Sequence, residues 1–194
     1  IKALVPPYVR ISRVLRDIPS KFIVAGLKDS LRDVVRERMV LEGRECRCVR
    51  CREYGHRARA GREIGEPGLK RLDYDASGGR EMFLSFEDSR ETLFGLLRLR
   101  IQEEPVPAFG PAPGPWAIVR ELHVFGSQVP LKERRDEAAQ HRGYGKALLQ
   151  EAERIAMEEF RAPRLLVLSG TGAREYYRDF GYCLENEYMV KKLS

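Results

Sequence analysis

The chain has 194 residues, of which 43% are hydrophobic, and this is enough to bury a real core. No apolar run approaches the roughly 20 residues that span a bilayer, and the start Ile1-Lys2-Ala3 lacks the charged and apolar regions of a signal peptide. We therefore expect no membrane partner. Because the chain opens without methionine and runs at once into strand-like residues, we expect it to be the tail of a longer protein.

Basic residues are concentrated near the N-terminus. The net charge of +6 comes from 35 Lys and Arg and 29 Asp and Glu; residues 1–62 hold 16 and 7 of these, which leaves 19 and 22 for the rest. The first part is therefore +9 and the remainder −3. An Arg-rich solvated surface would account for this asymmetry. However, neutralising phosphates releases counterions, so the charge favours a nucleic acid as partner of the N-terminal part.

Two elements are predicted ahead of the first cysteine. Val9-Arg10-Ile11 begins as a short alternating strand. Ser30 followed by Asp33 resembles a capping box, and Gly43 stands where the helix would stop, so a helix is predicted between them. The polar, glycine-punctuated stretch 57–68 marks a boundary, and we place the two parts at 1–66 and 67–194.

The second part is predicted to contain strands and an amphipathic helix. Alternating residues on both sides of Ser77-Gly78-Gly79 indicate a β-hairpin, and further strands are expected near Leu93–Ile101, Ile118–Phe125 and Leu165–Leu168. Five prolines between 105 and 115 predict a rigid, extended loop. One helical face is apolar: Leu148, Leu149, Ala152, Ile155, Ala156 and Phe160. The predicted fold class is α+β with a mixed sheet.

Three of the four cysteines fall within six residues. Cys46, Cys48 and Cys51 are an odd cluster, and the first two are too close to bridge without strain. We therefore predict a metal site in a reducing compartment, and hence a cytoplasmic protein. The isolated Cys183 is expected to be an ordinary buried thiol.

The cysteine cluster fits Zn²⁺, because three thiolates and a nitrogen satisfy tetrahedral coordination and the arginines around them favour ionised thiols. His56 is the nearest fourth ligand, while His123, an acidic residue or a water are alternatives. We expect a structural zinc that ties two parts of the chain together.

A loop with two glycines lies between a predicted strand and the amphipathic helix. Gly143 and Gly145 let a ligand approach the backbone, and a helix N-terminus offers free N–H groups and the positive end of the helix dipole. A lone G-x-G is usually only a turn, but strand, loop and helix in this order are specific. Arg142 and Lys146 add positive charge. We therefore predict a pyrophosphate site.

Two motifs resemble those of GNAT acetyltransferases. Residues 140–149 are similar to their Q/R-x-x-G-x-G/A loop, and residues 173–182 to their C-terminal helix and turn. The resemblance implies acetyl-CoA as cofactor and the GNAT fold, a mixed and mostly antiparallel sheet flanked by helices. The implied cofactor contacts come from the loop and the strand before it: Leu122, His123, Val124, Gln140, Arg142, Gly143, Tyr144, Gly145 and Lys146.

In that family a tyrosine protonates the departing thiolate, and it aligns with Tyr177. A phenol suits this role because it holds its proton at neutral pH. Tyr176 is the obvious rival, and a core position is the structural alternative for Tyr177. Glu121, His123 and His141 are further candidates for a base, but we place none of them in the chemistry.

A closer resemblance covers essentially the whole chain. Segments 9–19, 46–53, 120–126 and 188–193 are similar to the family of Elongator catalytic subunits. This implies a tRNA-modifying enzyme in which tRNA-stimulated hydrolysis of acetyl-CoA supplies a carboxymethyl group for the wobble uridine. It also implies tRNA and other Elongator-type subunits as partners. On this basis residues 1–66 are the end of a radical S-adenosylmethionine domain and a zinc-binding linker, and residues 67–194 are the GNAT domain.

Such radical domains hold an iron–sulfur cluster and S-adenosylmethionine. The spacing Cys46-x-Cys48-x-x-Cys51 is not the C-x-x-x-C-x-x-C of these clusters, so we expect both cofactors only in an N-terminal part that this chain lacks. Two other functions stay open. One is a protein lysine acetyltransferase acting on histones, and the other is a zinc-stapled RNA-binding module whose CoA site only senses.

Overall fold

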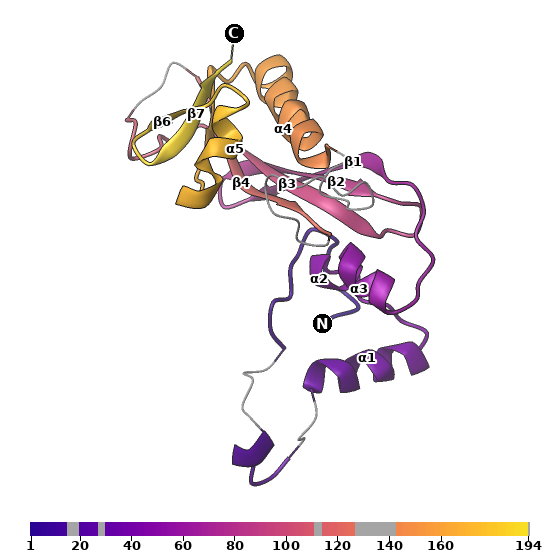
Figure 1. Cartoon of the computed structure of the whole chain (residues 1–194). Helices are drawn as coiled ribbons and strands as arrows, with labels where there is room; N and C mark the ends of the chain where they lie inside the picture. The colour runs from indigo at the N-terminus through magenta and orange to yellow at the C-terminus, as the bar shows by residue number, and fades with distance from the viewer. Residues whose placement is uncertain (15–19, 27–29, 111–113, 127–142, 194) are drawn as a thin grey trace. The chain divides into compact units, whose positions relative to one another are not determined.

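The computed structural model describes residues 1–14, 20–26, 30–110, 114–126 and 143–193. The chain divides into two compact units, Ile1–Ile64 and Gly65–Ser194 (Figure 1). None of the helices in the described ranges is long and apolar enough to cross a membrane.

The first unit consists of short helices joined by extended chain. The helices are α1 (Leu31–Leu41), α2 (Val49–Arg52) and α3 (Tyr54–Arg59), and a single 3-10 turn lies at Ser20–Phe22. The prediction of α1 is confirmed, although not its capping box. The Ser30 side chain makes no capping hydrogen bond, and its carbonyl instead accepts the N–H of Asp33 at 2.9 Å. Gly43 then takes a φ of 64°, which glycine adopts readily at a helix end.

The strand predicted at Val9-Arg10-Ile11 is wrong, because residues 1–14 form no strand. This segment is held by isolated contacts: the carbonyl of Val9 accepts the N–H of Val49 at 2.9 Å, and Arg10 Nη1 donates to Glu53 Oε1 at 2.7 Å. An alternating segment becomes a strand only beside another strand that satisfies its backbone groups. The described part of this unit offers helices and loops instead.

The second unit is built on a seven-stranded sheet in the order β1-β2-β3-β4-β5-β7-β6. Its strands are β1 (Gly68–Ala76), β2 (Gly79–Glu87), β3 (Leu93–Gln102), β4 (Trp116–Val124), β5 (Arg164–Val167), β6 (Cys183–Glu185) and β7 (Tyr188–Lys192). Neighbours are antiparallel except for the parallel pair β4 and β5. The predicted mixed and mostly antiparallel sheet is confirmed.

The β1–β2 hairpin follows from its turn residues. Ser77 and Gly78 have φ values of 49° and 71°. A two-residue turn with positive φ at both positions matches the right-handed twist of the strands that it joins.

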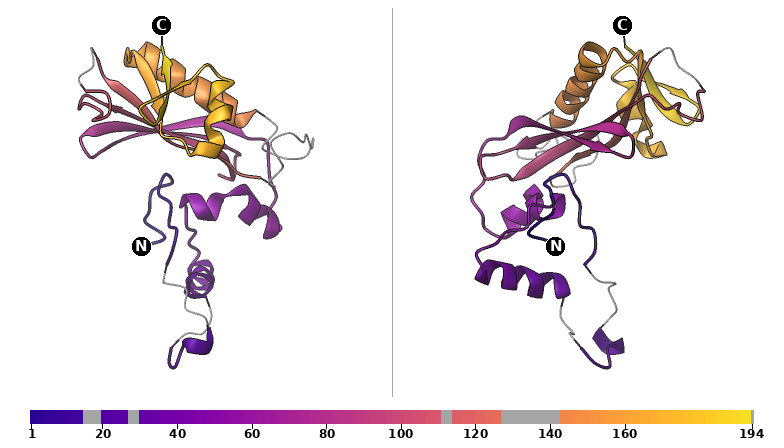
Figure 2. Two further views of the ribbon diagram at one scale, coloured as in Figure 1. Left: turned by 60° about the vertical axis from the view of Figure 1, so that its left-hand side comes forward. Right: turned by 180° about the vertical axis from the view of Figure 1, so that it is seen from behind.

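The helix α4 (Tyr144–Arg154) lies across one face of the sheet and continues into a π-helical turn at Ile155–Glu159 (Figure 2). Its apolar side packs on the inner residues of the central strands, which places the main core between helix and sheet. The shorter helix α5 (Arg174–Arg178) follows a 3-10 turn at Thr171–Ala173 and adds Tyr177 to the same core.

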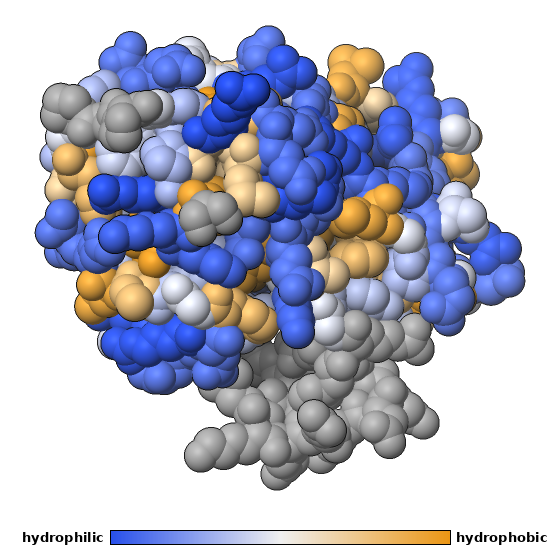
Figure 3. Space-filling view, turned by 90° about the horizontal axis from the view of Figure 1, so that it is seen from above, coloured by the Kyte–Doolittle hydropathy of each residue, from blue (hydrophilic) through white to orange (hydrophobic). Residues whose placement is uncertain are grey.

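The face of the molecule seen in Figure 3 is mostly hydrophilic, with small separate apolar groups. Exposed large apolar side chains of the second unit come from different elements and include Leu69, Met157, Leu168 and Leu184. Single exposed apolar residues of this kind are usual on protein surfaces.

Candidate functional site

The strand β4 has a strand on both sides only at its beginning. Its parallel pairing with β5 covers Ala117–Val119, whereas its pairing with β3 continues to Val124. The register against β3 shifts between Val119 and Glu121, so Arg120 is the extra residue of a β-bulge. From this bulge to Val124, the β5 side of β4 has no strand neighbour in the described part of the sheet. Its backbone N–H and C=O groups can therefore pair with an extended ligand.

The N-terminal turn of α4 lies beside this open edge. Gly143 precedes the helix with a φ of 75°, in the left-handed region that favours glycine. Gly145 is needed for space: a Cβ there would lie 2.6 Å from the Tyr176 hydroxyl oxygen and 3.5 Å from Val124 Cγ2. Free N–H groups of the helix, the end of β4 and a phenol thus meet at one place.

The other predicted cofactor residues have different surroundings. Leu122 is half-buried and packs against the core, and His123 is exposed, with its ring centroid 4.5 Å from that of Phe125. Tyr144 is buried, with its ring 4.7 Å from that of Phe86, so only its backbone could contact a ligand. Lys146 is exposed. Gln140 and Arg142 lie outside the described residues.

The two tyrosines of α5 differ in burial and in the described neighbours of their hydroxyl groups. Tyr177 is buried in the core, where its ring lies 5.9 Å from that of Tyr182. Tyr176 is half-buried, and its hydroxyl reaches the first turn of α4. Burial, and secondly the neighbouring Tyr177, raises the pKa of Tyr176 to about 12, and burial also raises the pKa of Tyr177. Both phenols therefore keep their protons at neutral pH.

The other candidate bases are constrained or lie outside the described chain. Glu121 accepts a hydrogen bond from Arg98 Nε at 2.8 Å, so its carboxylate is held as the partner of a guanidinium. His141 lies outside the described residues.

A buried carboxylate that the sequence motifs did not indicate holds the bulge of β4. Glu81 on β2 is fully buried, and its Oε1 accepts from Arg120 at 2.5 Å and from Arg100 at 3.1 Å. Arg120 is the bulge residue itself. In the sequence, Glu81 is only one of two charged residues, Arg80 and Glu81, ahead of the apolar run in β2, and this does not reveal which arginines will be its partners.

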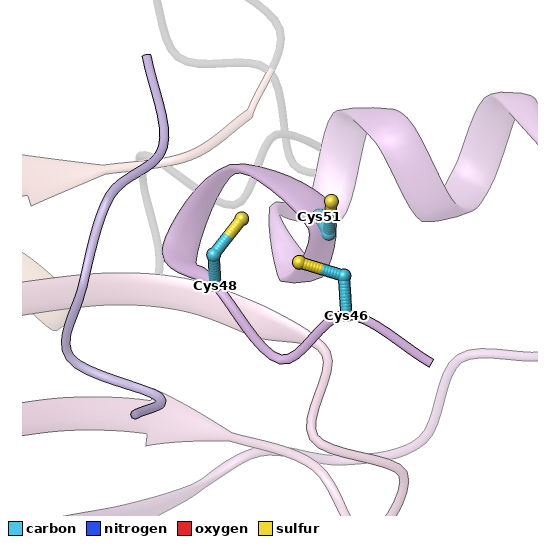
Figure 4. A group of neighbouring side chains, drawn as sticks. All are labelled: Cys46, Cys48 and Cys51. Atoms are coloured by element: carbon cyan, nitrogen blue, oxygen red, sulfur yellow. The ribbon is translucent and has the colours of Figure 1, made fainter. Parts of the chain in front are cut away.

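The three clustered cysteines come together in the first unit. Cys46 precedes α2, Cys48 is its N-cap residue and Cys51 lies within it. Their Sγ atoms lie within 4.8 Å of one another, and Figure 4 shows the side chains facing a common point. A hydrogen bond from the Cys51 thiol lowers the pKa of Cys48 to about 4, and the same bond raises the pKa of Cys51. Three sulfur donors gathered within this distance fit a thiophilic ion such as Zn²⁺.

His56 is not part of this cluster of thiols. Its Nε2 lies 3.6 Å from Glu53 Oε2, and its ring lines the same pocket as Cys46 and Cys51. Burial is the main cause that lowers the pKa of His56, which favours the neutral imidazole that a metal requires.

The expectation that Cys183 is buried is wrong. It is exposed on β6, the edge strand of the sheet.

Comparisons with known proteins agree with this geometry. The model of the acetyltransferase (GNAT) family matches residues 50–182. The chain is 61% identical over 195 residues to the tRNA uridine(34) acetyltransferase of Dehalococcoides mccartyi and 46% identical over 201 residues to the human Elongator complex protein 3. Both matches cover 100% of this chain, but it spans only 42% and 36% of those relatives. Among solved structures, the archaeal Elp3 of Methanocaldococcus infernus with an N-terminal deletion matches with a TM-score of 0.86 and 46% identity, over 99% of this chain and 46% of that one.

The chain therefore belongs to the GNAT acetyltransferase family, and the predicted fold is confirmed. Within that family it is related over its whole length to tRNA uridine(34) acetyltransferases and to Elongator complex protein 3, as its motifs predicted.

Proposed function

We propose that this chain binds acetyl-CoA for a tRNA wobble-uridine-modifying enzyme and hydrolyses the thioester when tRNA is bound. The main support for the proposal is that Gly145, Val124 and Tyr176 lie close together at the open edge of β4. The pyrophosphate would bind to the N-terminal turn of α4, and the pantetheine would pair with the β4 backbone as an added strand. The similarity to the tRNA uridine(34) acetyltransferase of Dehalococcoides mccartyi supports tRNA as the substrate class.

The proton donor that we propose is Tyr176 rather than Tyr177. Hydrolysis of the thioester consumes water and releases acetate and the CoA thiol, so the departing sulfur needs a proton. Tyr176 places its hydroxyl at the proposed cofactor site, whereas Tyr177 belongs to the core. Burial keeps the phenol protonated until it can protonate the sulfur.

We propose that the thiol cluster holds a structural zinc, with Cys46, Cys48 and Cys51 as ligands and His56 as the fourth. When bound, the ion would cross-link the segment from Cys46 to Cys51 with His56 of α3. Iron–sulfur and S-adenosylmethionine chemistry would come from residues outside this chain, because its cysteine spacing does not fit such a cluster. A tRNA-modifying role further implies a cytoplasmic protein that works beside other Elongator-type subunits.

The test is an assay of acetyl-CoA hydrolysis by the purified chain, in which release of the free CoA thiol is measured. The proposal expects a slow basal rate that rises several-fold with tRNA and not with a histone peptide. Acetylation of the peptide would favour a protein lysine acetyltransferase. Binding of acetyl-CoA without turnover under any condition would favour an RNA-binding module whose CoA site only senses.

A further inference from the structure

The first unit contains a basic pocket that the cofactor site does not use. It has a volume of about 210 Å³ and is lined by residues of α1, of α3 and of the cysteine segment. Seven lining residues are Lys or Arg, and two, Asp33 and Glu45, are acidic. These two acids are already paired with pocket arginines, Asp33 with Arg36 at 3.9 Å and Glu45 with Arg62 at 2.8 Å. Cys46, Cys51 and His56, three of the proposed zinc ligands, line the same pocket, and even with both thiols counted as thiolates the seven basic residues leave an excess of positive charge.

Two of its arginines have buried N–H groups for which the described residues offer no acceptor. Arg32 donates through Nη2 to the carbonyls of Ile11 at 3.0 Å and Ser12 at 3.1 Å, but its Nη1 is buried and has no hydrogen-bond partner among the described residues. The Nε of Arg50 is likewise buried and unsatisfied within those ranges. Arg32 lies in the first turn of α1 and Arg50 between Cys48 and Cys51, so two separate elements bring the groups to one pocket.

The unsatisfied groups indicate the chemistry of a ligand. Buried polar groups in native proteins nearly always have partners, so two orphaned guanidinium donors in one pocket call for an acceptor. A water would satisfy an N–H but would leave the positive charge uncompensated. A phosphate supplies several acceptor oxygens and negative charge together, and the planar guanidinium matches its geometry.

We infer that this pocket binds a backbone phosphate of RNA, with Arg32 and Arg50 as its ligands. The inference rests on the proposed function in taking RNA as the substrate. A phosphodiester of a polyanion is favoured over a free phosphate because the charge of +9 over residues 1–62 extends beyond the pocket, where only a longer ligand can use it. Arg50 stands between two cysteines of the thiol cluster, and a metal bound there would hold its segment in place.

The experiment compares two double variants that lose the same charge. In the first, Arg32→Gln is combined with Arg50→Gln; in the second, Arg13→Gln is combined with Arg38→Gln, both exposed and outside the pocket. Binding of fluorescently labelled tRNA is measured by anisotropy at several salt concentrations. The pocket variant should bind roughly tenfold or more weakly at about 0.15 M salt, and its slope of log K against log salt should fall by about one. The control variant should lose less than about threefold.

Arg32→Gln alone provides a second variant outside the cysteine segment, and zinc content and circular dichroism show whether each variant is folded. Wild-type affinity and salt slope in a folded pocket variant would overturn the inference and leave the proposed function intact. No binding of tRNA by the wild-type chain would instead overturn the RNA function, and with it the inference. Inorganic phosphate could also raise the melting temperature of the wild-type chain but not that of the pocket variant. If tRNA affinity were then unchanged in the variant, the pocket would be assigned to free phosphate, and its role in RNA binding would be overturned.

Discussion

The hydroxyl oxygen of Tyr176 lies 2.6 Å from the point that a Cβ at Gly145 would occupy. The Tyr176 phenol therefore occupies the space that a side chain at position 145 would need, so the two positions depend on each other. Gly143 has a different reason: an added Cβ there meets no atom of the described residues within 4 Å, but the φ of 75° disfavours other residues.

Gly145→Ala should lower the thermal stability of the chain and weaken acetyl-CoA binding, because the new methyl group displaces the Tyr176 hydroxyl. Adding Tyr176→Phe should restore part of the stability, since the next atom of that ring is 3.7 Å from the methyl position. A double-mutant cycle should give a coupling energy of about 0.5–3 kcal/mol, the range for residues in contact. Additive effects of the two substitutions would show that they do not touch.

Tyr176→Phe should leave the Kd for acetyl-CoA nearly unchanged and slow thioester hydrolysis by roughly a hundredfold, the lower range for loss of a general acid. Tyr177→Phe is the matched control, and it should reduce turnover much less because that side chain lies in the core. Single-turnover measurements separate binding from chemistry. A larger loss of turnover in Tyr177→Phe than in Tyr176→Phe would assign the role of proton donor to Tyr177.

The pH dependence follows from the raised pKa of Tyr176. The phenol is the active form of an acid, and with a pKa of about 12 it remains protonated as the pH rises through the usual tyrosine range near 10. Hydrolysis by the chain, corrected for the uncatalysed rate, should therefore lose no activity through this group between pH 7 and 10. An ionisation near 9 that disappears in Tyr176→Phe would contradict this.

The purified chain should contain about one zinc, because the three thiols are already gathered for a tetrahedral site. Cys48→Ser should lose the metal and lower the melting temperature. Cys183→Ser is a suitable control, since that thiol is exposed on β6 and should change neither property. Metal analysis of protein prepared without chelators is the measurement, and an absence of metal would refute the site.

Glu81→Ala should destabilise the second unit by about 3–5 kcal/mol, as expected when one partner of a buried ion pair is removed. Arg120→Ala should cost less, because its side chain is 53% exposed and Arg100 still donates to the same oxygen, Oε1. Both substitutions should weaken acetyl-CoA binding, since each frees the bulge of β4. Denaturant titration and calorimetry would measure the two effects. Wild-type affinity for acetyl-CoA in a folded Arg120→Ala variant would show that the bulge does not contribute to cofactor binding.

Much of the local structure could be predicted from the sequence. Hydrophobic alternation and the turn Ser77-Gly78 specify the hairpin, and the apolar spacing of α4 specifies its buried face, because these signals depend on residues close together in the chain. The pyrophosphate loop is visible for the same reason, as Gly143 and Gly145 stand at the start of that helix.

Long-range contacts decided the rest. Val9–Ile11 has the pattern of a strand, but the described part of its unit offers no strand to pair with. Tyr176 and Tyr177 are neighbours in the chain and both pack on the core, but only the packing of α5 determines that the Tyr176 hydroxyl reaches Gly145 of α4 and that Tyr177 is the more buried of the two. Glu81 and Arg120 are 39 positions apart, and Arg32 and Arg50 lie in separate elements, so neither pairing has a local signal. The sequence alone thus determined the periodic elements and the loop motif, whereas the tertiary structure decided which distant charges and hydroxyl groups meet, because such contacts depend on the packing of the whole unit.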